Sequence, residues 1–268
     1  AGSRKALAFS DAVETLGADF FASAGLDATV LGVSALQQNF GEAFALLADA
    51  TLRPRLEVGD FTRAKKLWID ALKKRGDDPS QVASLVARRV FFSDGAPYGH
   101  PESGTLAGAA RVTLADVKLA HAERFRLDRA TLVVVGRITR AEVTALAAQH
   151  LSEKKRPSAP PALAPASVVR DARPRVALVD RPKAVQTVIV AMRPGASASE
   201  ASVQQLELIN TALGGSFTSR LNQNLREEKG WTYGAGSRLA ATRTPGWFWV
   251  RTEVQADKSG ASVREVLS

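Results

Sequence analysis

The sequence predicts an α+β protein with two domains. Its 268 residues are 45% hydrophobic and 24% charged, enough for two cores in domains of roughly 100 to 150 residues each. Apolar residues at helical spacing recur in both halves, and short β-branched or apolar runs lie between them. A stretch rich in Pro, Ala and charge, 151–171, has neither hydrophobic period, so we expect a linker between domains 1–150 and 172–268.

In the first half, residues 27–36 have the β-branched content of a strand, and 130–136 form an apolar run typical of a buried strand. We expect both strands in one sheet. No strand is predicted before 27–36, so this half looks incomplete. The helical spacing of apolar residues predicts helices over 10–16, 41–52, 60–72, 81–90, 114–125 and 140–150.

The second half is predicted to contain four strands and three helices. The turn-like TRTPG joins the last two strands, which we expect to form a hairpin. The predicted strands are 175–180, 186–193, 232–240 and 247–255, and the predicted helices are 200–213, 217–228 and one that begins near Lys258.

A weak internal repeat relates the two halves. Residues 32–47 and 250–267 each contain a strand that ends in an apolar residue plus Gln, followed by an amphipathic helix. The repeat predicts domains of related topology. About 100 further residues follow this helix only in the first half, so we expect the second domain to be truncated and the chain to be a piece cut at both ends.

Composition excludes several kinds of site. With no cysteine, disulfides, thiolate zinc sites and cysteine nucleophiles are absent, and both cytoplasm and bacterial periplasm remain open. No apolar run reaches the ~20 residues that span a bilayer. The net charge is +9, but the basic residues are scattered along the chain. One of the densest groups, which includes Lys65, Lys66, Lys73 and Lys74, lies on one predicted helix, so we expect a solvated helix face and no nucleic-acid partner.

The most informative segment is 213–237, LGGSFTSRLNQNLREEKGWTYGAGS. It resembles the C-terminal half of the insulinase/pitrilysin-type zinc peptidases, which include the mitochondrial processing peptidases. Residues 3–65 and the PYGHP loop at 97–101 are also similar to that family. The resemblance implies mainly antiparallel sheets packed with helices. The matching positions of the segment are Gly214, Gly215, Ser219, Arg220, Leu221, Leu225, Arg226, Glu227, Lys229, Gly230 and Tyr233.

Catalytic members of this family hold zinc with an inverted His-x-x-Glu-His motif and a later Glu. None of His100, His121 and His150 has another His at the i, i+4 spacing that places two ligands on one helix face. The resemblance puts the later ligand at Ala71, whose methyl group cannot bind zinc, and the adjacent Asp70 is turned about 100° around the helix. We therefore expect no metal or cofactor in this chain, with zinc in a catalytic partner.

The resemblance implies that Arg226 and Tyr233 reach the substrate at a zinc site in the opposite half. A guanidinium and a phenol can donate hydrogen bonds to a peptide carbonyl and to the developing oxyanion without a metal of their own. Taken singly, Arg226 also fits a salt bridge at a helix end, and Tyr233 a half-buried strand aromatic.

Three functional hypotheses follow from the resemblance. The first is a non-catalytic subunit that pairs with a homologous zinc peptidase and binds unfolded peptides by adding a strand to a sheet edge. The second is a piece of an active zinc endopeptidase whose zinc motif lies upstream of Ala1. The third is a structural subunit similar to the respiratory-chain core proteins. Retention of Arg226 and Tyr233 argues against the third.

Overall fold

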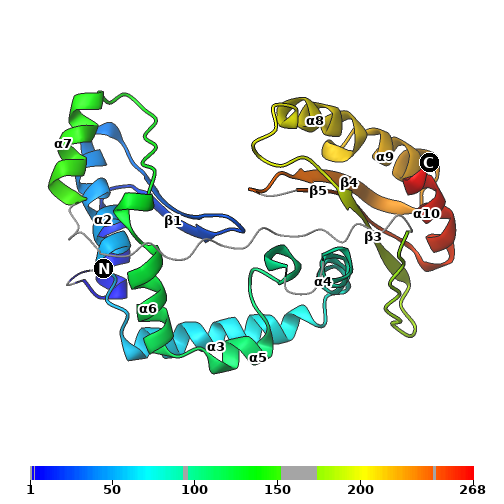
Figure 1. Cartoon of the computed structure of the whole chain (residues 1–268), viewed down its shortest axis with the longest axis horizontal. Coiled ribbons are helices and arrows are strands. Elements are labelled where there is room, and N and C mark those ends of the chain that lie inside the picture. The colour runs from blue at the N-terminus through cyan, green and yellow to red at the C-terminus, as the bar shows by residue number, and fades with distance from the viewer. Residues whose placement is uncertain (1, 3, 93–95, 152–173, 244–245) are drawn as a thin grey trace. The chain divides into compact units, whose positions relative to one another are not determined.

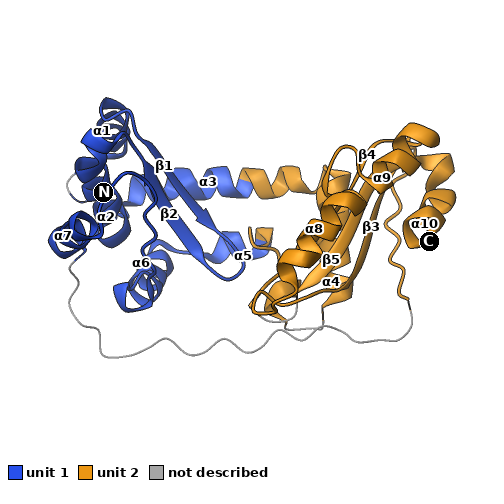
Figure 2. Ribbon diagram, turned by 90° about the horizontal axis from the view of Figure 1, so that it is seen from above, with its two compact units in different colours: residues 1–69, 107–162 blue, residues 70–106, 163–268 orange. Residues whose placement is uncertain are grey.

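The computed structural model describes residues 2, 4–92, 96–151, 174–243 and 246–268. Contacts divide the chain into two compact units, Ala1–Ile69 with Ala107–Ala162, and Asp70–Leu106 with Leu163–Ser268 (Figure 2). Residues 70–106 thus group with the second half, across the predicted boundary at residue 150. The predicted linker, apart from Leu151, lies outside the described residues, and the domain boundaries stay a prediction.

The first unit contains a two-stranded antiparallel sheet and several helices. Strands β1 and β2 pair from Asp19 opposite Ser34 to Ala24 opposite Thr29. Helix α2 packs against β2 through a buried face that includes Phe44 and Leu46. The elements of this unit are α1 (Ala6–Thr15), β1 (Asp19–Ala24), β2 (Thr29–Ser34), η1 (Gln37–Asn39), α2 (Phe40–Leu52), most of α3 (Val58–Arg75) and of α5 (Leu106–Arg111), α6 (Leu114–Arg124), η3 (Leu127–Arg129) and α7 (Arg140–His150).

Two strand expectations for this half are wrong. Residues 130–136 form no strand, and Val133 and Val135 are 77% and 93% exposed. An apolar run becomes a strand only where a neighbouring strand pairs with its backbone, and no described strand pairs with this run. A strand does precede 27–36, namely β1, whose sequence DFFASA shows no alternation of apolar and polar residues.

The second unit contains a three-stranded antiparallel sheet in the order β3-β5-β4. The hairpin of β4 and β5 is confirmed. Helices α8, α9 and α10 lie along this sheet (Figure 1). The elements are α4 (Pro79–Phe91), η2 (Pro97–Gly99), β3 (Gln186–Pro194), α8 (Val203–Asn210), the π-helical turns η4 (Thr211–Gly215) and η5 (Gln223–Glu228), α9 (Arg220–Asn222), β4 (Thr232–Ala240), β5 (Trp247–Gln255), η6 (Ala256–Lys258) and α10 (Ser259–Leu267).

Alternate residues of β5 face opposite sides of the sheet, because side chains alternate along a strand. Val250 packs with Leu221 and Leu225 in the core beneath the helices. Trp247 faces the other side, where its ring lies 5.2 Å from that of Phe92, just after α4. The second half of the sequence thus supplies a sheet that is packed on both faces.

The predicted strand at 175–180 is wrong. These residues form no strand, and Val176 and Leu178 are 92% and 88% exposed. Both segments of the sequence repeat nevertheless take the same order of elements. Strand β2 is followed by η1 and α2, and β5 by η6 and α10.

No helix in the described part of the chain is both long and apolar enough to cross a membrane.

Candidate functional site

Tyr233 lies on β4 with its side chain directed to solvent, and it is 90% exposed. The register of β4 against β5 shifts between Thr232, opposite Val254, and Ala235, opposite Thr252. Such a bulge disrupts the ladder locally and redirects the side chains it contains. The expectation of a half-buried strand aromatic at this position is therefore wrong.

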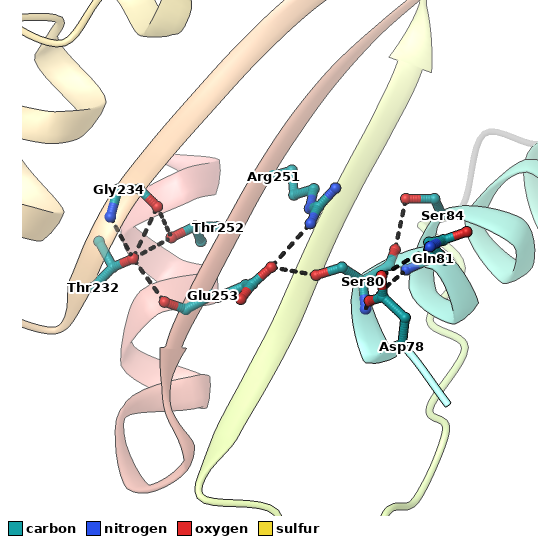
Figure 3. A network of polar contacts seen from close by, with 9 residues as sticks. All are labelled: Asp78, Ser80, Gln81, Ser84, Thr232, Gly234, Arg251, Thr252 and Glu253. Carbon is teal, nitrogen blue, oxygen red and sulfur yellow. Dashed lines mark hydrogen bonds and ion pairs between the residues drawn. The ribbon is translucent and has the colours of Figure 1, made fainter. Parts of the chain in front are cut away.

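Two threonine hydroxyls bond with the backbone within the bulge. Thr232 Oγ1 accepts from the Gly234 N–H at 3.0 Å and lies 2.6 Å from the Glu253 carbonyl. Thr252, which is 2% exposed, approaches the Gly234 carbonyl and Thr232 Oγ1, both at 3.1 Å (Figure 3). The N–H and carbonyl of Gly234, which lies within the register shift, are thus paired locally.

Asn222 bonds with β4 directly after the bulge. Its amide, in a residue that is 5% exposed, donates to the Ala235 carbonyl and accepts from the Ala235 N–H, both at 2.9 Å. Asn210 is arranged similarly at Ser237, donating to its carbonyl at 3.1 Å and accepting from its hydroxyl at 2.5 Å. Side-chain amides therefore occupy the outer edge of β4 at these two positions.

An open depression of about 520 Å³ lies beside Tyr233. Gly236 is opposite Arg251 in the register, so no side chain of β4 fills the space next to that guanidinium. The depression lies within the size range of ligand sites, roughly 300 to 1,000 Å³. Its lining residues are Gln186, Thr232, Tyr233, Gly234, Gly236, Trp249, Arg251, Thr252 and Glu253.

Arg226 does not line this depression. Its guanidinium lies over the ring of Phe217, 3.9 Å from the centroid, and Nη1 is 3.3 Å from Glu227 Oε1. That contact is an ion pair without hydrogen-bond geometry, since the buried Nη1 has no hydrogen-bond partner among the described residues. The alternative of a helix-end ion pair thus holds for Arg226, and the structure does not bring Arg226 and Tyr233 into one cavity.

The turn between these two residues is closed by the backbone. The Gly230 and Trp231 N–H groups donate to the carbonyls of Arg226 and Leu225 at 3.1 and 3.0 Å. Gly230 adopts φ +65°, a left-handed conformation that glycine takes without steric cost. The π-helical turn that carries Arg226 is therefore tied directly to the start of β4.

Charged groups at the floor of the depression connect β5 to α4. Glu253 accepts hydrogen bonds from the Ser80 hydroxyl and from Arg251 Nη2, the latter at 2.9 Å (Figure 3). The Ser80 hydrogen bond, and next Arg251, hold the pKa of the Glu253 carboxyl below its usual value. Asp78 caps α4 by accepting from the Ser80 N–H at 2.9 Å, and the side chain of Gln81 is the main cause that lowers the pKa of Asp78.

The residues considered as zinc ligands from the sequence do not form a zinc site. Ala71 is exposed on α3, and Asp70 lies 3.9 Å from Lys73 in an ion pair. His121 Nε2 is bonded to the Thr51 carbonyl at 2.8 Å, and His100 is exposed in its loop. No group of three His, Asp or Glu residues that could hold a metal ion occurs in the described ranges.

Sequence reasoning identified Tyr233 but missed the residues around it. Asn222, Thr232 and Thr252 were overlooked because a polar residue in a helix or strand gives no sign that it is buried. Arg251 and Trp249 lie two positions apart on a strand, which places them on one face. That period-2 pattern, with Arg251 opposite Gly236 of β4, was the available signal for a depression.

Comparisons with known proteins agree with this fold. The family described as Peptidase M16 inactive domain matches residues 111–268. A protein of Mycobacterium leprae named an uncharacterized zinc protease is 27% identical over 240 residues, which are 88% of this chain and 53% of the relative. A Streptomyces coelicolor protein with the same description is 25% identical over 252 residues, 92% of this chain and 54% of the relative. The chain thus spans about half the length of the curated relatives it matches.

Two solved structures share the fold. A peptidase M16 inactive domain from Pseudomonas fluorescens has a TM-score of 0.88 at 24% identity, over 98% of this chain and 64% of that one. A protease from Helicobacter pylori has a TM-score of 0.86 at 17% identity, over 99% and 65%. The α+β class with antiparallel sheets is thus confirmed. Because the family match covers more than half of the sequence, this chain belongs to the insulinase-type M16 peptidase family, matching its inactive domain.

Proposed function

We propose that this chain is the non-catalytic, substrate-binding subunit of a heterodimeric zinc metallopeptidase, supplying Arg226 and Tyr233 to the active site of a homologous partner. The observation that carries the proposal is the 90% exposure of Tyr233 beside an open depression, with the backbone groups of Gly234 and Ala235 hydrogen-bonded directly after it. An exposed phenol on an ordered strand is available to a substrate without rearrangement of the protein.

In this proposal, the side chains of Arg226 and Tyr233 act by hydrogen bonding to the substrate. The partner would hold the zinc ion and the attacking water. The Tyr233 hydroxyl would donate to the peptide carbonyl and to the oxyanion as charge develops, a contribution of about 3 kcal/mol for a well-placed donor. Arg226 would act as a second donor through the guanidinium edge not covered by Phe217. Neither residue has to gain or lose a proton in this role.

The sheet edge constrains how a peptide approaches. Asn222 and Asn210 already bond with the outer edge of β4 at Ala235 and Ser237. A strand added along that edge would have to displace both amides. We therefore propose that the peptide lies across the depression beside Tyr233, and that strand addition, if it takes place, uses another sheet edge.

The decisive experiment pairs Tyr233→Phe with a catalytic subunit that co-purifies with the wild-type chain. We expect kcat/KM for peptide hydrolysis to fall on the order of 10²-fold to 10³-fold, the loss typical of one oxyanion donor. Thermal stability should not change, because the hydroxyl is solvent-exposed. Tyr98→Phe is the matched control, since Tyr98 is 6% exposed and packs against Phe92 and Trp247. Unchanged hydrolysis with Tyr233→Phe in an intact complex would reject the proposed role.

A second candidate is favoured by the names of the relatives. Proteins described as zinc proteases are about twice as long as the matched region, and they align with most of this chain. The chain would then be one part of an active zinc endopeptidase, with Tyr233 in the same role toward a zinc site elsewhere in that polypeptide. Hydrolysis by the complete gene product alone, abolished by a chelator and restored by zinc, would favour this candidate over the heterodimer.

A further inference from the structure

The backbone around Tyr233 is held from both sides by side chains rather than by a neighbouring strand. Within the bulge, the Thr232 hydroxyl bonds with the Glu253 carbonyl of β5 and accepts from the Gly234 N–H, and the Thr252 hydroxyl bonds with the Gly234 carbonyl. After it, Asn222 bonds with both backbone groups of Ala235. The exposed Tyr233 therefore lies between two fixed points, although its own side chain has no packing to hold it.

Asn222 replaces a strand partner at this position. An Asn amide presents one carbonyl oxygen and one NH₂ group in a plane, as a peptide group presents its acceptor and donor. Ala235 lies opposite Thr252 of β5, and β5 is the only strand paired with β4 in the described sheet. Since the Ala235 N–H and carbonyl bond with Asn222, they point away from β5, at the outer edge of the sheet.

The other bonds of Asn222 fix its own position. Nδ2 also lies 3.1 Å from the Ser216 carbonyl and 3.2 Å from Ser219 Oγ, and Ser219 is 1% exposed. The loop before α9, the helix and the strand thus meet at one buried amide. Loss of that amide would leave both outward-facing backbone groups of Ala235 without a partner, directly after the bulge.

We propose that Asn222 is a positioning residue for Tyr233, and this inference rests on the proposed function of Tyr233 as a hydrogen-bond donor to substrate. The Asn222 side-chain amide holds the backbone of the bulge in place. The Tyr233 phenol can then move only by rotation about its two side-chain torsions. Asn222 itself is buried and touches no substrate. Its effect on hydrolysis is exerted through the backbone of Ala235.

The test uses the full chain labelled with ¹⁵N-tyrosine, which gives two backbone amide signals because the sequence has two tyrosines. Tyr233→Phe and Tyr98→Phe assign them. In the wild type we expect the Tyr233 amide to be as rigid as ordered backbone, with an order parameter near 0.85. In Asn222→Ala it should fall toward the flexible range, below about 0.6, while the Tyr98 amide stays unchanged.

Asn224→Ala is the matched control. Asn224 lies two residues further along, and its Nδ2 donates to Glu265 Oε2 at 3.0 Å rather than to β4. Asn222→Ser keeps a neutral hydroxyl at this buried position without placing a charge against the Ala235 and Ser216 carbonyls, so it is the second variant if Asn222→Ala does not fold. It should loosen the Tyr233 amide to a smaller extent.

A rigid Tyr233 amide in a folded Asn222 variant would overturn the inference, and so would equal loosening in Asn224→Ala. A general structural role would loosen the Tyr98 amide as well. In the reconstituted enzyme, Asn222→Ala should lower kcat with KM nearly unchanged. If Tyr233→Phe has no effect on hydrolysis, the proposed function fails, but the NMR measurement still decides whether Asn222 positions Tyr233.

Discussion

The Ser80 hydroxyl at the start of α4 donates a hydrogen bond to the Glu253 carboxylate on β5, across 173 positions of sequence. This bond and the ion pair of Glu253 with Arg251 connect the helix to the floor of the depression beside Tyr233. The polar network therefore joins a segment of the first half of the sequence to the sheet that carries the candidate site.

Glu253→Gln should destabilise the protein at neutral pH by on the order of 1 kcal/mol, because it replaces charged hydrogen bonds that are partly exposed. The pKa of Glu253 is lowered in the folded state from its ordinary value near 4.5. Its stabilising contribution is therefore fully present above that value and is lost as the pH falls below it through the folded pKa. Urea unfolding of both proteins between pH 7 and pH 3 measures this. A difference that stays constant with pH would contradict the prediction.

Leu225→Ala should cost about 2 to 5 kcal/mol of unfolding free energy, since it leaves a cavity in the core beneath the helices. Leu225 is 0% exposed and packs with Leu221, Ala235 and Val250. Leu208→Ala on α8 is the control, because Leu208 is 74% exposed and should change stability by less than about 0.5 kcal/mol. Equal midpoints of urea unfolding for the two variants would show that this core does not stabilise the unit.

Arg226→Lys should lower kcat/KM in the reconstituted enzyme by roughly tenfold or more. An ammonium group cannot reproduce the planar stacking of the guanidinium on Phe217 or its proposed hydrogen bond to the substrate. Arg220→Lys, at an exposed position six residues earlier, is expected to retain activity. Steady-state peptide hydrolysis distinguishes them. If Arg226→Lys were fully active, Arg226 would be a structural ion-pair residue only.

Zinc should not bind the purified chain stoichiometrically with micromolar affinity. The position that the family resemblance assigns to a ligand is Ala71, and His121 is already bonded to the Thr51 carbonyl. Calorimetric titration with zinc, with a metal-free catalytic homologue as positive control, measures this directly. One zinc ion bound per chain would contradict this prediction and would mean that other residues of the chain supply the ligands.

Much of the secondary structure followed from local patterns. The amphipathic period predicted α2, α3, α4, α6 and α7 within a few residues, and the turn-like TRTPG predicted the hairpin of β4 and β5. Strand predictions that were based on the local pattern alone were wrong. Residues 130–136 and 175–180 have strand-like composition but remain exposed and unpaired, whereas β1, with its small residues, pairs with β2. Pairing depends on a neighbour that local composition does not specify.

The sequence by itself determined the resemblance to the family, the presence of Arg226 and Tyr233, and the expectation that Ala71 takes the place of a zinc ligand, because these depend only on residue identity and order. Only the tertiary structure decided that Tyr233 is exposed on a bulge and that Asn222 takes the place of a strand partner. It also decided that Arg226 stacks on Phe217 and that Ser80 reaches Glu253. The first two features depend on which backbone groups of β4 lack a ladder partner, and the last two depend on which side chains the fold brings together. A local sequence pattern specifies neither.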